Sequence, residues 1–204
     1  MHLTRLSLEL RSAAARRDLG DVYDMHRTLS RAFVSNSDEK PGRFLWRVEP
    51  ASASRAPLVL VQSESAPDWS FLCSLPGYLA REPEVKTWDP ARLLELNAKR
   101  RFRLVANPTV TRDGKRQGIV QETEQLDWLS RQGTKLGFAV EMALVTDSDF
   151  VVSRSGQSLI QFQRACYDGI LSVQDPSRLL SAMSAGVGPA KAFGCGLLTV
   201  AAIA

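Results

Sequence analysis

A histidine that could transfer protons stands in the segment Tyr23-Asp-Met-His26-Arg-Thr-Leu-Ser30. Apolar residues recur at helical spacing here, which predicts a helix over residues 21–33 with His26 at the edge of the apolar stripe. Because positions three and four apart share a helix face, Tyr23, His26 and Ser30 form one polar strip. An imidazole titrates near neutral pH and suits general acid or base catalysis. The alternative is a boundary histidine that packs its ring and hydrogen-bonds locally.

A glycine-rich segment lies between a predicted helix over 175–185 and an apolar strand. It contains Gly186, Gly188, Lys191, Gly194 and Gly196. Glycines let a polyanion approach backbone N–H groups closely, and Lys191 adds a positive charge. The segment matches neither the Walker loop, since Cys195 follows Gly194, nor the Rossmann pattern, since the order is helix to strand. Gly186 suits a left-handed helix stop. The alternative is a tight connector whose glycines serve packing.

Basic residues are clustered along the chain, although the net charge is only +4, from 26 Lys and Arg against 22 Asp and Glu. The clusters are Arg16-Arg17, Lys99-Arg100-Arg101 with Arg103, and Lys115-Arg116. Arg101 and Arg103 alternate with apolar residues and therefore share one strand face, whereas Lys115 and Arg116 fall in a polar loop over 111–118 that we expect to be mobile. Such clusters suit phosphate contacts, and the alternative is an ordinary solvated surface.

Several classes of site are excluded by the cysteine, histidine and carboxylate pattern. Cys73, Cys166 and Cys195 form no Cys-x-x-Cys pair, and the only histidines are His2 and His26. We therefore expect no zinc site, no two-metal carboxylate site and no cofactor. The cysteines are predicted to be small buried residues in a reducing compartment. No apolar run could cross a membrane, and the N-terminus lacks a signal peptide's core, so we expect a cytoplasmic protein.

The elements that must position these residues follow the order β-α-β-β-α-β twice. In the first half we predict strands at 2–10, 44–49, 58–62 and 85–88 and helices at 21–33 and 69–75. In the second half we predict strands at 101–107, 138–145, 159–173 and 195–203, with a turn or bulge at 167–169, and helices at 122–135 and 175–185. Each half fits a ferredoxin-like fold, an α+β architecture, with the boundary near residues 92–99. Phe44 and Trp46 are expected in the core.

Four stretches in order resemble one family. They are Arg16-Arg-Asp-Leu19 with Tyr23-Asp-Met-His26-Arg-Thr-Leu29, Phe44-Leu-Trp-Arg-Val-Glu49, Phe102-Arg-Leu-Val-Ala-Asn-Pro108, and Gly186-Val-Gly-Pro-Ala-Lys-Ala-Phe-Gly-Cys-Gly-Leu-Leu198. Together they span nearly the whole chain and resemble the CRISPR RNA-processing endoribonucleases, in particular the CasE family of the type I-E Cascade complex. The resemblance implies two tandem ferredoxin-like domains, here residues 1–95 with the catalytic helix and 96–204 with a hairpin and glycine-rich loop for RNA binding.

The resemblance also implies a reaction. In CasE-like enzymes a histidine on the first helix, in a Tyr-x-x-His setting, is catalytic, and Tyr23 and His26 match that motif. The implied reaction is metal-independent attack of an RNA 2′-hydroxyl on the adjacent phosphate at the base of a repeat stem-loop. It leaves a 2′,3′-cyclic phosphate and a 5′-hydroxyl. Whether His26 is the base or the acid stays open.

The implied partners are precursor CRISPR RNA and the other Cascade subunits, with a monomer outside the complex. The family's basic hairpin engages the RNA stem, so Arg154, in the predicted turn 153–157, is the candidate there. The full set of RNA-binding candidates is Arg16, Arg17, Arg27, Ser30, Arg101, Arg103, Lys115, Arg116, Arg154, Gly186, Gly188, Lys191, Gly194 and Gly196. Two alternatives remain: a noncatalytic RNA-binding subunit of the same fold, and a small-molecule or regulatory domain.

Overall fold

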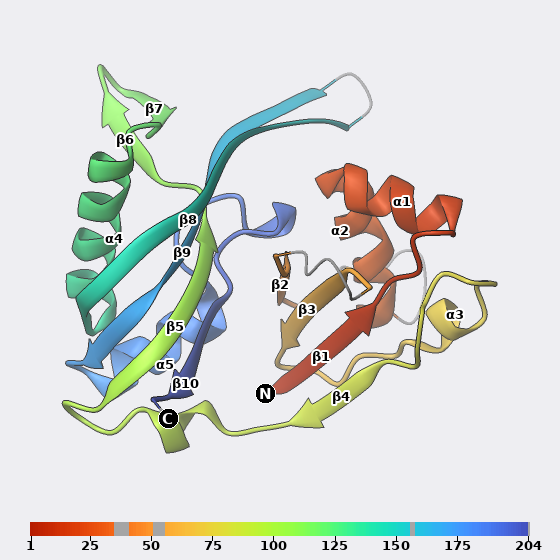
Figure 1. Cartoon of the computed structure of the whole chain (residues 1–204), viewed down its shortest axis with the longest axis horizontal. Coiled ribbons are helices and arrows are strands. Elements are labelled where there is room, and N and C mark those ends of the chain that lie inside the picture. The colour runs from red at the N-terminus through yellow and green to blue at the C-terminus, as the bar shows by residue number, and fades with distance from the viewer. Residues whose placement is uncertain (35–40, 51–55, 156–157, 204) are drawn as a thin grey trace. The chain divides into compact units, whose positions relative to one another are not determined.

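The computed structural model describes residues 1–34, 41–50, 56–155 and 158–203. The chain divides into two compact units (Figure 1). The first comprises Met1–Trp88 together with Ala192–Gly194, and the second Asp89–Lys191 with Cys195–Ala204. The division after Trp88 lies a few residues before the linker position expected from the sequence. The return of residues 192–194 to the first unit was not expected.

The first unit is an antiparallel four-stranded sheet with helices. Its strands are β1 (His2–Ser7), β2 (Phe44–Val48), β3 (Leu58–Ser63) and β4 (Glu84–Thr87), in the order β2-β3-β1-β4. Its helices are α1 (Ala13–Gly20), α2 (Val22–Ser30), the 3₁₀ turn η1 (Arg31–Phe33) and the short α3 (Ser70–Cys73). This strand order and the alternation of strands and helices are those of a ferredoxin-like fold, which confirms the predicted fold class.

The core of the first unit lies between the sheet and its helices. Met25 and Leu29, on the apolar stripe of α2, pack in one cluster with sheet residues such as Leu6 and Val61. Phe44 and Trp46 of β2 belong to the same cluster, as predicted. Because Met25 and His26 are consecutive on the helix, burial of Met25 determines the direction in which the His26 side chain projects from α2.

The second unit repeats the architecture with longer strands. Its sheet has the order β10-β5-β9-β8 and consists of β5 (Lys99–Ala106), β8 (Phe138–Ser155), β9 (Ser158–Val173) and β10 (Leu198–Ala202). The helices α4 (Glu122–Leu136) and α5 (Pro176–Ala185) cover one face (Figure 1). Trp128 of α4 stacks on Tyr167 of β9 with ring centroids 6.2 Å apart. The remaining elements are β6 (Thr109–Arg112), β7 (Lys115–Gly118), and the 3₁₀ turns η2 (Pro90–Leu93) and η3 (Lys191–Phe193).

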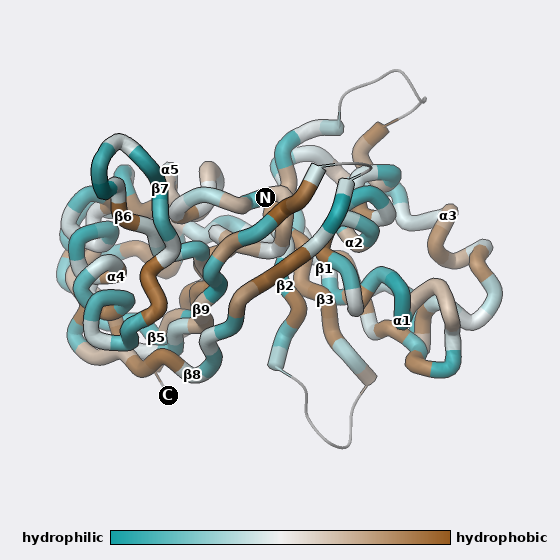
Figure 2. Tube along the Cα trace, turned by 90° about the horizontal axis from the view of Figure 1, so that it is seen from above, coloured by the Kyte–Doolittle hydropathy of each residue, from teal (hydrophilic) through white to brown (hydrophobic). Residues whose placement is uncertain are grey.

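The expectation of a mobile loop over residues 111–118 is wrong, because those residues belong to the β6–β7 hairpin. Asp113 and Gly114 both have positive φ, 51° and 71°, as a two-residue type I′ turn requires. The Asp-Gly pair is therefore the sequence signal for this hairpin. Figure 2 shows that the hairpin tip is hydrophilic. The strands therefore lack the alternation of apolar and polar residues by which a strand is predicted from sequence.

Three further expectations need correction. A helix, α1, begins after Ser12, whose hydroxyl caps Ala15 N–H, and no helix was predicted there. The bulges of the long hairpin lie on β8, between Val140 and Met142 and between Val145 and Asp147, and not at 167–169. The two extra residues lengthen and bend β8, which runs well past the predicted strand.

Two local predictions are also wrong. Cys73 is exposed, although Cys166 and Cys195 are buried as expected. Gly186 ends α5 with φ 79° and ψ 151°, which is a glycine conformation outside the left-handed helical region.

Candidate active site on helix α2

The start of α2 determines where its polar strip begins. The Asp21 carboxylate accepts hydrogen bonds from the N–H groups of Tyr23 at 2.8 Å and Asp24 at 3.1 Å. An aspartate cap satisfies N–H groups that have no partner inside the helix and places negative charge at its positive end. The helix is thereby fixed at its first turn, and His26 follows Tyr23 on the same face.

The His26 ring is held between two phenylalanines. Its face stacks on Phe44, with centroids 5.2 Å apart and an interplanar angle of 15°. Phe193 meets it edge-on, at 6.5 Å and 67°. Nδ1 is buried and has no hydrogen-bond partner among the residues that the structure describes. Chemistry at this ring therefore falls to the other nitrogen, Nε2.

Phe193 is brought to His26 by contacts of its neighbours with Trp46. The indole N–H of Trp46 donates to the carbonyl oxygen of Ala192 at 3.1 Å. A β-carbon at Gly194, where φ is 81°, would lie 3.1 Å from atoms of the indole ring. Glycine at 194 therefore allows the chain to pass over Trp46. Sequence reasoning assigned Trp46 only to the core and gave Phe193 no role, since nothing in their spacing links such distant parts of the chain.

We expect His26 to titrate below its usual pKa of 6.5, because burial of the ring disfavours the charged form. The unfolded chain then binds this proton at higher pH than the folded chain does. The stability that depends on the neutral ring is complete above about pH 6.5 and falls as the pH drops toward the folded pKa. An NMR titration of the variant His2→Gln, which leaves His26 as the only histidine signal, measures this pKa. A midpoint at or above 6.5 would contradict the burial.

The other polar residues of α2 have distinct environments. Ser30 donates its hydroxyl hydrogen to the His26 carbonyl oxygen at 2.5 Å, so this group serves the helix backbone. Arg27 pairs with Asp24 at 2.8 Å and is otherwise exposed. Tyr23 is half-buried, and its hydroxyl makes no hydrogen bond within residues 1–34, 41–50 or the other described ranges. Tyr23 and His26 are thus the two groups of the strip left for a substrate.

Arg16 and Arg17 are tied into the structure around α1. Arg16 donates to the carbonyl oxygens of Leu10 and Arg11 at 2.6 and 2.9 Å. Arg17 pairs at 2.7 Å with the carboxylate of Asp18, a residue only 1% exposed that also accepts from the Tyr78 hydroxyl at 2.7 Å. Both arginines remain exposed, so each can present part of its guanidinium to solvent while its position is fixed.

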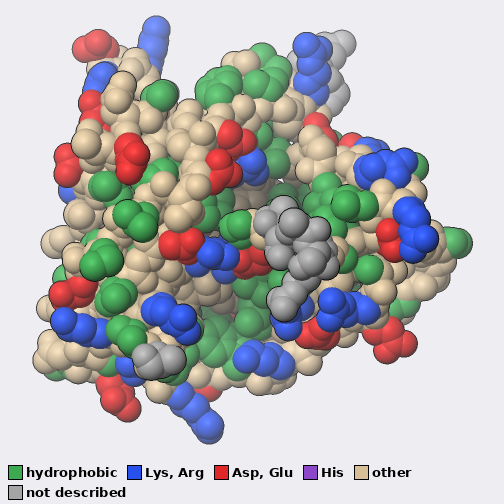
Figure 3. All heavy atoms as spheres, viewed as in Figure 1, with side chains coloured by type: hydrophobic (Ala, Val, Ile, Leu, Met, Phe, Trp, Pro, Cys, Tyr) green, Lys and Arg blue, Asp and Glu red, His purple; other side chains and the backbone are tan. Residues whose placement is uncertain are grey.

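Basic candidates of the second unit occupy its sheet and two hairpins. Arg101 and Arg103 share a face of β5, as predicted from their spacing, and Arg103 forms a double hydrogen bond with Asp168 at 2.6 and 2.8 Å. On the small hairpin Lys115 lies directly opposite Arg112, and charged side chains stand out there at the upper left of Figure 3. Arg154 is exposed near the end of β8, whereas Gly156 and Gln157 of the predicted turn lie outside the described residues.

The glycines of the C-terminal segment allow close backbone packing. A β-carbon at Gly188, with φ 76°, would lie 3.1 Å from the Trp128 ring, and one at Gly196, with φ 91°, would lie 3.2 Å from Lys191 Cγ. The N–H of Gly186 donates to Ala182 and that of Gly196 to Val105, at 2.8 and 2.7 Å. These two N–H groups are therefore engaged within the fold, and the tight-connector interpretation holds for part of the segment.

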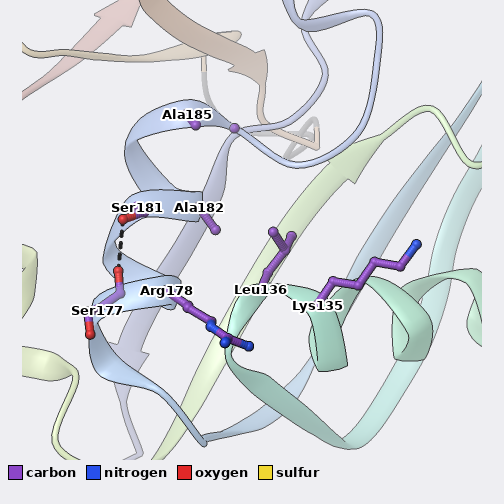
Figure 4. Close-up of a pocket in the computed structure, with 8 residues that line it drawn as sticks. Lys135, Leu136, Ser177, Arg178, Ser181, Ala182 and Ala185 are labelled. Atoms are coloured by element: carbon purple, nitrogen blue, oxygen red, sulfur yellow. Dashed lines mark hydrogen bonds between the residues drawn. The ribbon is translucent and has the colours of Figure 1, made fainter.

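A separate depression lies between α4 and α5. Figure 4 shows Arg178 extending from α5 toward α4, near Lys135 and Leu136, while the Ser181 hydroxyl donates to the Ser177 carbonyl oxygen at 2.9 Å. Arg178 also pairs with Asp175 at 3.2 Å. None of the residues predicted to be catalytic lines this depression. Among the described residues, no three His, Cys, Asp or Glu side chains form a metal-binding group. No described helix is both long and apolar enough to span a membrane.

Comparison with known proteins gives consistent matches over nearly the full chain. Residues 1–202 match a family described as CRISPR associated protein. The CRISPR-associated endoribonuclease Cse3 of Thermus thermophilus is 40% identical over 215 residues, covering 98% of this chain and 100% of that protein. The CRISPR system Cascade subunit CasE of Escherichia coli (strain K12) is 28% identical over 194 residues, covering 89% and 92%.

A solved structure of CRISPR endoribonuclease Cse3 bound to a 19-nucleotide RNA is similar in fold. It has a TM-score of 0.87 and 39% sequence identity, covering 98% of this chain and 100% of that one. The structure of Thermus thermophilus Cse3 with an RNA representing a pre-cleavage complex gives a TM-score of 0.86 at 38% identity, with 98% of both chains covered.

Proposed function

The chain belongs to the CRISPR-associated proteins, in the CasE group of endoribonucleases, and we propose that it cuts precursor CRISPR RNA at the base of the repeat stem-loop with His26 and Tyr23. It keeps the processed RNA and joins the other Cascade subunits, acting in the cytoplasm and as a monomer outside the complex. Residues 1–95 supply the catalytic helix, and residues 96–204 supply the hairpin and the glycine-rich loop for RNA.

The observation that carries this proposal is the environment of His26. The ring is fixed between Phe44 and Phe193, and the Tyr23 side chain lies on the same helix face. Burial lowers the pKa of His26, so the imidazole is neutral at neutral pH and can accept a proton at Nε2. The Tyr23 hydroxyl is a group that can donate one.

The proposed reaction balances with these two groups. His26 Nε2 takes the proton of the 2′-hydroxyl, and the resulting oxygen attacks the neighbouring phosphorus. The bond from phosphorus to the 5′-oxygen breaks, and that oxygen takes the proton of the Tyr23 hydroxyl. Proton exchange with solvent then returns the imidazolium of His26 and the tyrosinate of Tyr23 to their neutral forms. The products are a 2′,3′-cyclic phosphate and a 5′-hydroxyl. Positive side chains stabilise the charge that accumulates on the phosphate oxygens, and Arg27, which pairs with Asp24 on α2, is proposed as an RNA-binding residue.

The remaining cations are assigned to the RNA backbone. Lys115 and Arg116 are exposed on the β6–β7 hairpin, where Arg112 and Lys115 face each other across the strands. Arg112 also pairs with Glu124 at 3.5 Å, so Lys115 and Arg116 are the cations of this hairpin that we assign to RNA phosphates. Arg16, Arg17, Arg101, Arg103, Arg154, Lys191 and the backbone at Gly188 and Gly194 complete the proposed RNA-binding set. The N–H groups of Gly186 and Gly196 are left out of it, because they already donate to carbonyl oxygens of the fold.

The function is tested by incubating the purified chain with a repeat stem-loop RNA in EDTA. We expect one cut at the base of the stem, giving a 2′,3′-cyclic phosphate that treatment with acid converts to a monophosphate. A substrate with one 2′-deoxy nucleotide at the cut should bind equally well and stay intact, because it lacks the attacking oxygen. Cleavage of the deoxy substrate, or a requirement for added metal, would contradict the mechanism. Tight binding without any cut would favour a noncatalytic RNA-binding subunit.

A further inference from the structure

The orientation of the His26 ring depends on packing. A catalytic histidine is usually oriented by an acceptor bonded to its second nitrogen. Here Nδ1 is buried and has no such partner in the part of the chain that the structure describes. The groups that touch the ring are instead Phe44 on its face and Phe193 at its edge.

Phe44 is itself held in a row of aromatic rings. Phe33 stacks on it with centroids 4.7 Å apart and an angle of 15°. Trp69 then meets Phe33 edge-on at 5.9 Å and 81°. Aromatic pairs in these geometries add stability beyond the area they bury. Phe44 cannot shift without disturbing this row, so it provides a rigid surface for one face of His26.

Phe193 reaches the ring from the other end of the sequence. Its turn is held on Trp46, a residue 2% exposed, through the hydrogen bond to Ala192 and the close approach of Gly194. Trp46 and Phe44 are two residues apart on β2 and therefore point to the same face of the sheet. One strand thus supports both rings that contact His26, directly through Phe44 and through the turn that carries Phe193.

We propose that Phe193 is a positioning residue for His26, and that Trp46 acts through it. The edge contact of Phe193 prevents the imidazole from rotating away from Phe44, which keeps Nε2 directed at the RNA. The inference rests on the proposed role of His26. It gives the C-terminal glycine-rich segment a second task beyond contact with RNA, since Gly194 is what allows Phe193 to be placed there.

Charged groups near the His26 ring do not account for its lowered pKa. On α2, Asp24 and Arg27 pair with each other at 2.8 Å. On η1, Arg31 lies 4.3 Å above the Phe71 ring centroid. Lys191 is the first residue of η3, the turn that carries Phe193. Burial is the cause of the lowered pKa of His26, and Phe193 is one of the two rings that contact the imidazole, so we expect removal of that ring to move the pKa back toward its usual value.

The test compares Phe193→Leu, which removes the ring and leaves a smaller apolar side chain, with Phe193→Tyr, which keeps the aromatic edge. Phe71→Leu is the matched control, because Phe71 belongs to the same group of rings but contacts Trp69 and not His26. The variant Trp46→Phe keeps a ring and removes the N–H that holds Ala192. Each is assayed for single-turnover cleavage at saturating RNA, for RNA affinity, and for the His26 pKa by NMR in a His2→Gln background.

For Phe193→Leu we expect a cleavage rate about tenfold to a hundredfold lower, because a misplacement of about 1 Å can cost that much. The RNA dissociation constant should change by less than about threefold. The His26 pKa and the midpoint of the pH–rate profile should both rise toward 6.5, since the ring gains solvent. Phe193→Tyr and Phe71→Leu should have the cleavage rate and the His26 pKa of the parent chain. The cleavage rate of Trp46→Phe should lie between those of the parent chain and Phe193→Leu.

The outcomes separate this inference from the proposed function. If the parent chain does not cut RNA, the proposed function fails, and an unchanged His26 pKa in Phe193→Leu would overturn the positioning inference independently. If the parent chain cuts and Phe193→Leu cuts equally fast with the same pH profile, Phe193 does not position His26. If Phe193→Leu loses affinity and rate in parallel, Phe193 is an RNA contact and the inference is wrong.

Discussion

Replacing His26 with alanine is expected to slow RNA cleavage by about 10²- to 10⁴-fold at saturating RNA, the usual contribution of one positioned acid or base. The loss should appear in the rate and not in affinity, because the proposed contacts to the RNA backbone are spread over both units. The pH dependence should change as well. The parent chain should lose activity as the pH falls through the lowered pKa of His26, since protonation removes the acceptor.

The chain provides its own control for this experiment. His2 is the only other histidine, and its Nδ1 lies 3.3 Å from the Thr87 hydroxyl on the neighbouring strand. The variant His2→Ala should cut at the parent rate. Tyr23→Phe removes the proposed proton donor, and we expect it to lower the cleavage rate by less than His26→Ala does. If His26→Ala retained the parent rate, the active site would have to lie elsewhere.

Replacing Gly169 with alanine should cost about 3 kcal/mol of folding stability, the upper range for an added methyl group in a packed site. A β-carbon there would overlap the Met142 carbonyl oxygen and would lie 2.9 Å from both Ala143 Cα and a Phe102 ring atom. Two of these groups are backbone of β8 next to its first bulge, so relief requires the strands to separate. The midpoint of urea unfolding, followed by circular dichroism, measures the loss.

The matched control is Gly20→Ala. Gly20 is the last residue of α1, and a β-carbon there would meet no atom within 4 Å. Alanine is the better helix former by about 1 kcal/mol in a helix interior, so this change should leave stability equal or slightly raised. A Gly169→Ala variant as stable as the parent would show that β8 can move away from β9 at its bulge.

Much of the fold was predictable because apolar periodicity is a local property. The apolar stripe that predicts α2 is the stripe that packs on Leu6 and Val61, and the alternation in β2 places Phe44 and Trp46 in the core. The predicted order of elements gives the observed strand orders once the ferredoxin-like topology is assumed. The family resemblance then made His26 the catalytic candidate among otherwise ordinary helix residues.

The remaining features depend on chemistry that periodicity does not report. The β6–β7 strands are polar, and only the Asp113-Gly114 pair encodes their turn. The glycine at 169 led to the prediction of a bulge on β9, whereas the bulges lie on the neighbouring strand β8. In the sequence, a glycine that makes room for a bulge on the next strand cannot be distinguished from a glycine that forms a bulge itself. The contact of Phe193 with His26 joins distant parts of the chain, and no local pattern could predict it.

The return of Ala192–Gly194 to the first unit has a consequence for biosynthesis. Domains generally fold as units during translation, starting from the N-terminus. A nascent chain released up to residue 190 already carries all four strands of the first sheet, yet it lacks the ring that meets the edge of His26. The proposed catalytic group therefore acquires its final surroundings only when the second unit has been synthesised. The surroundings of His26 are therefore completed only after both hairpins of the second unit have been synthesised.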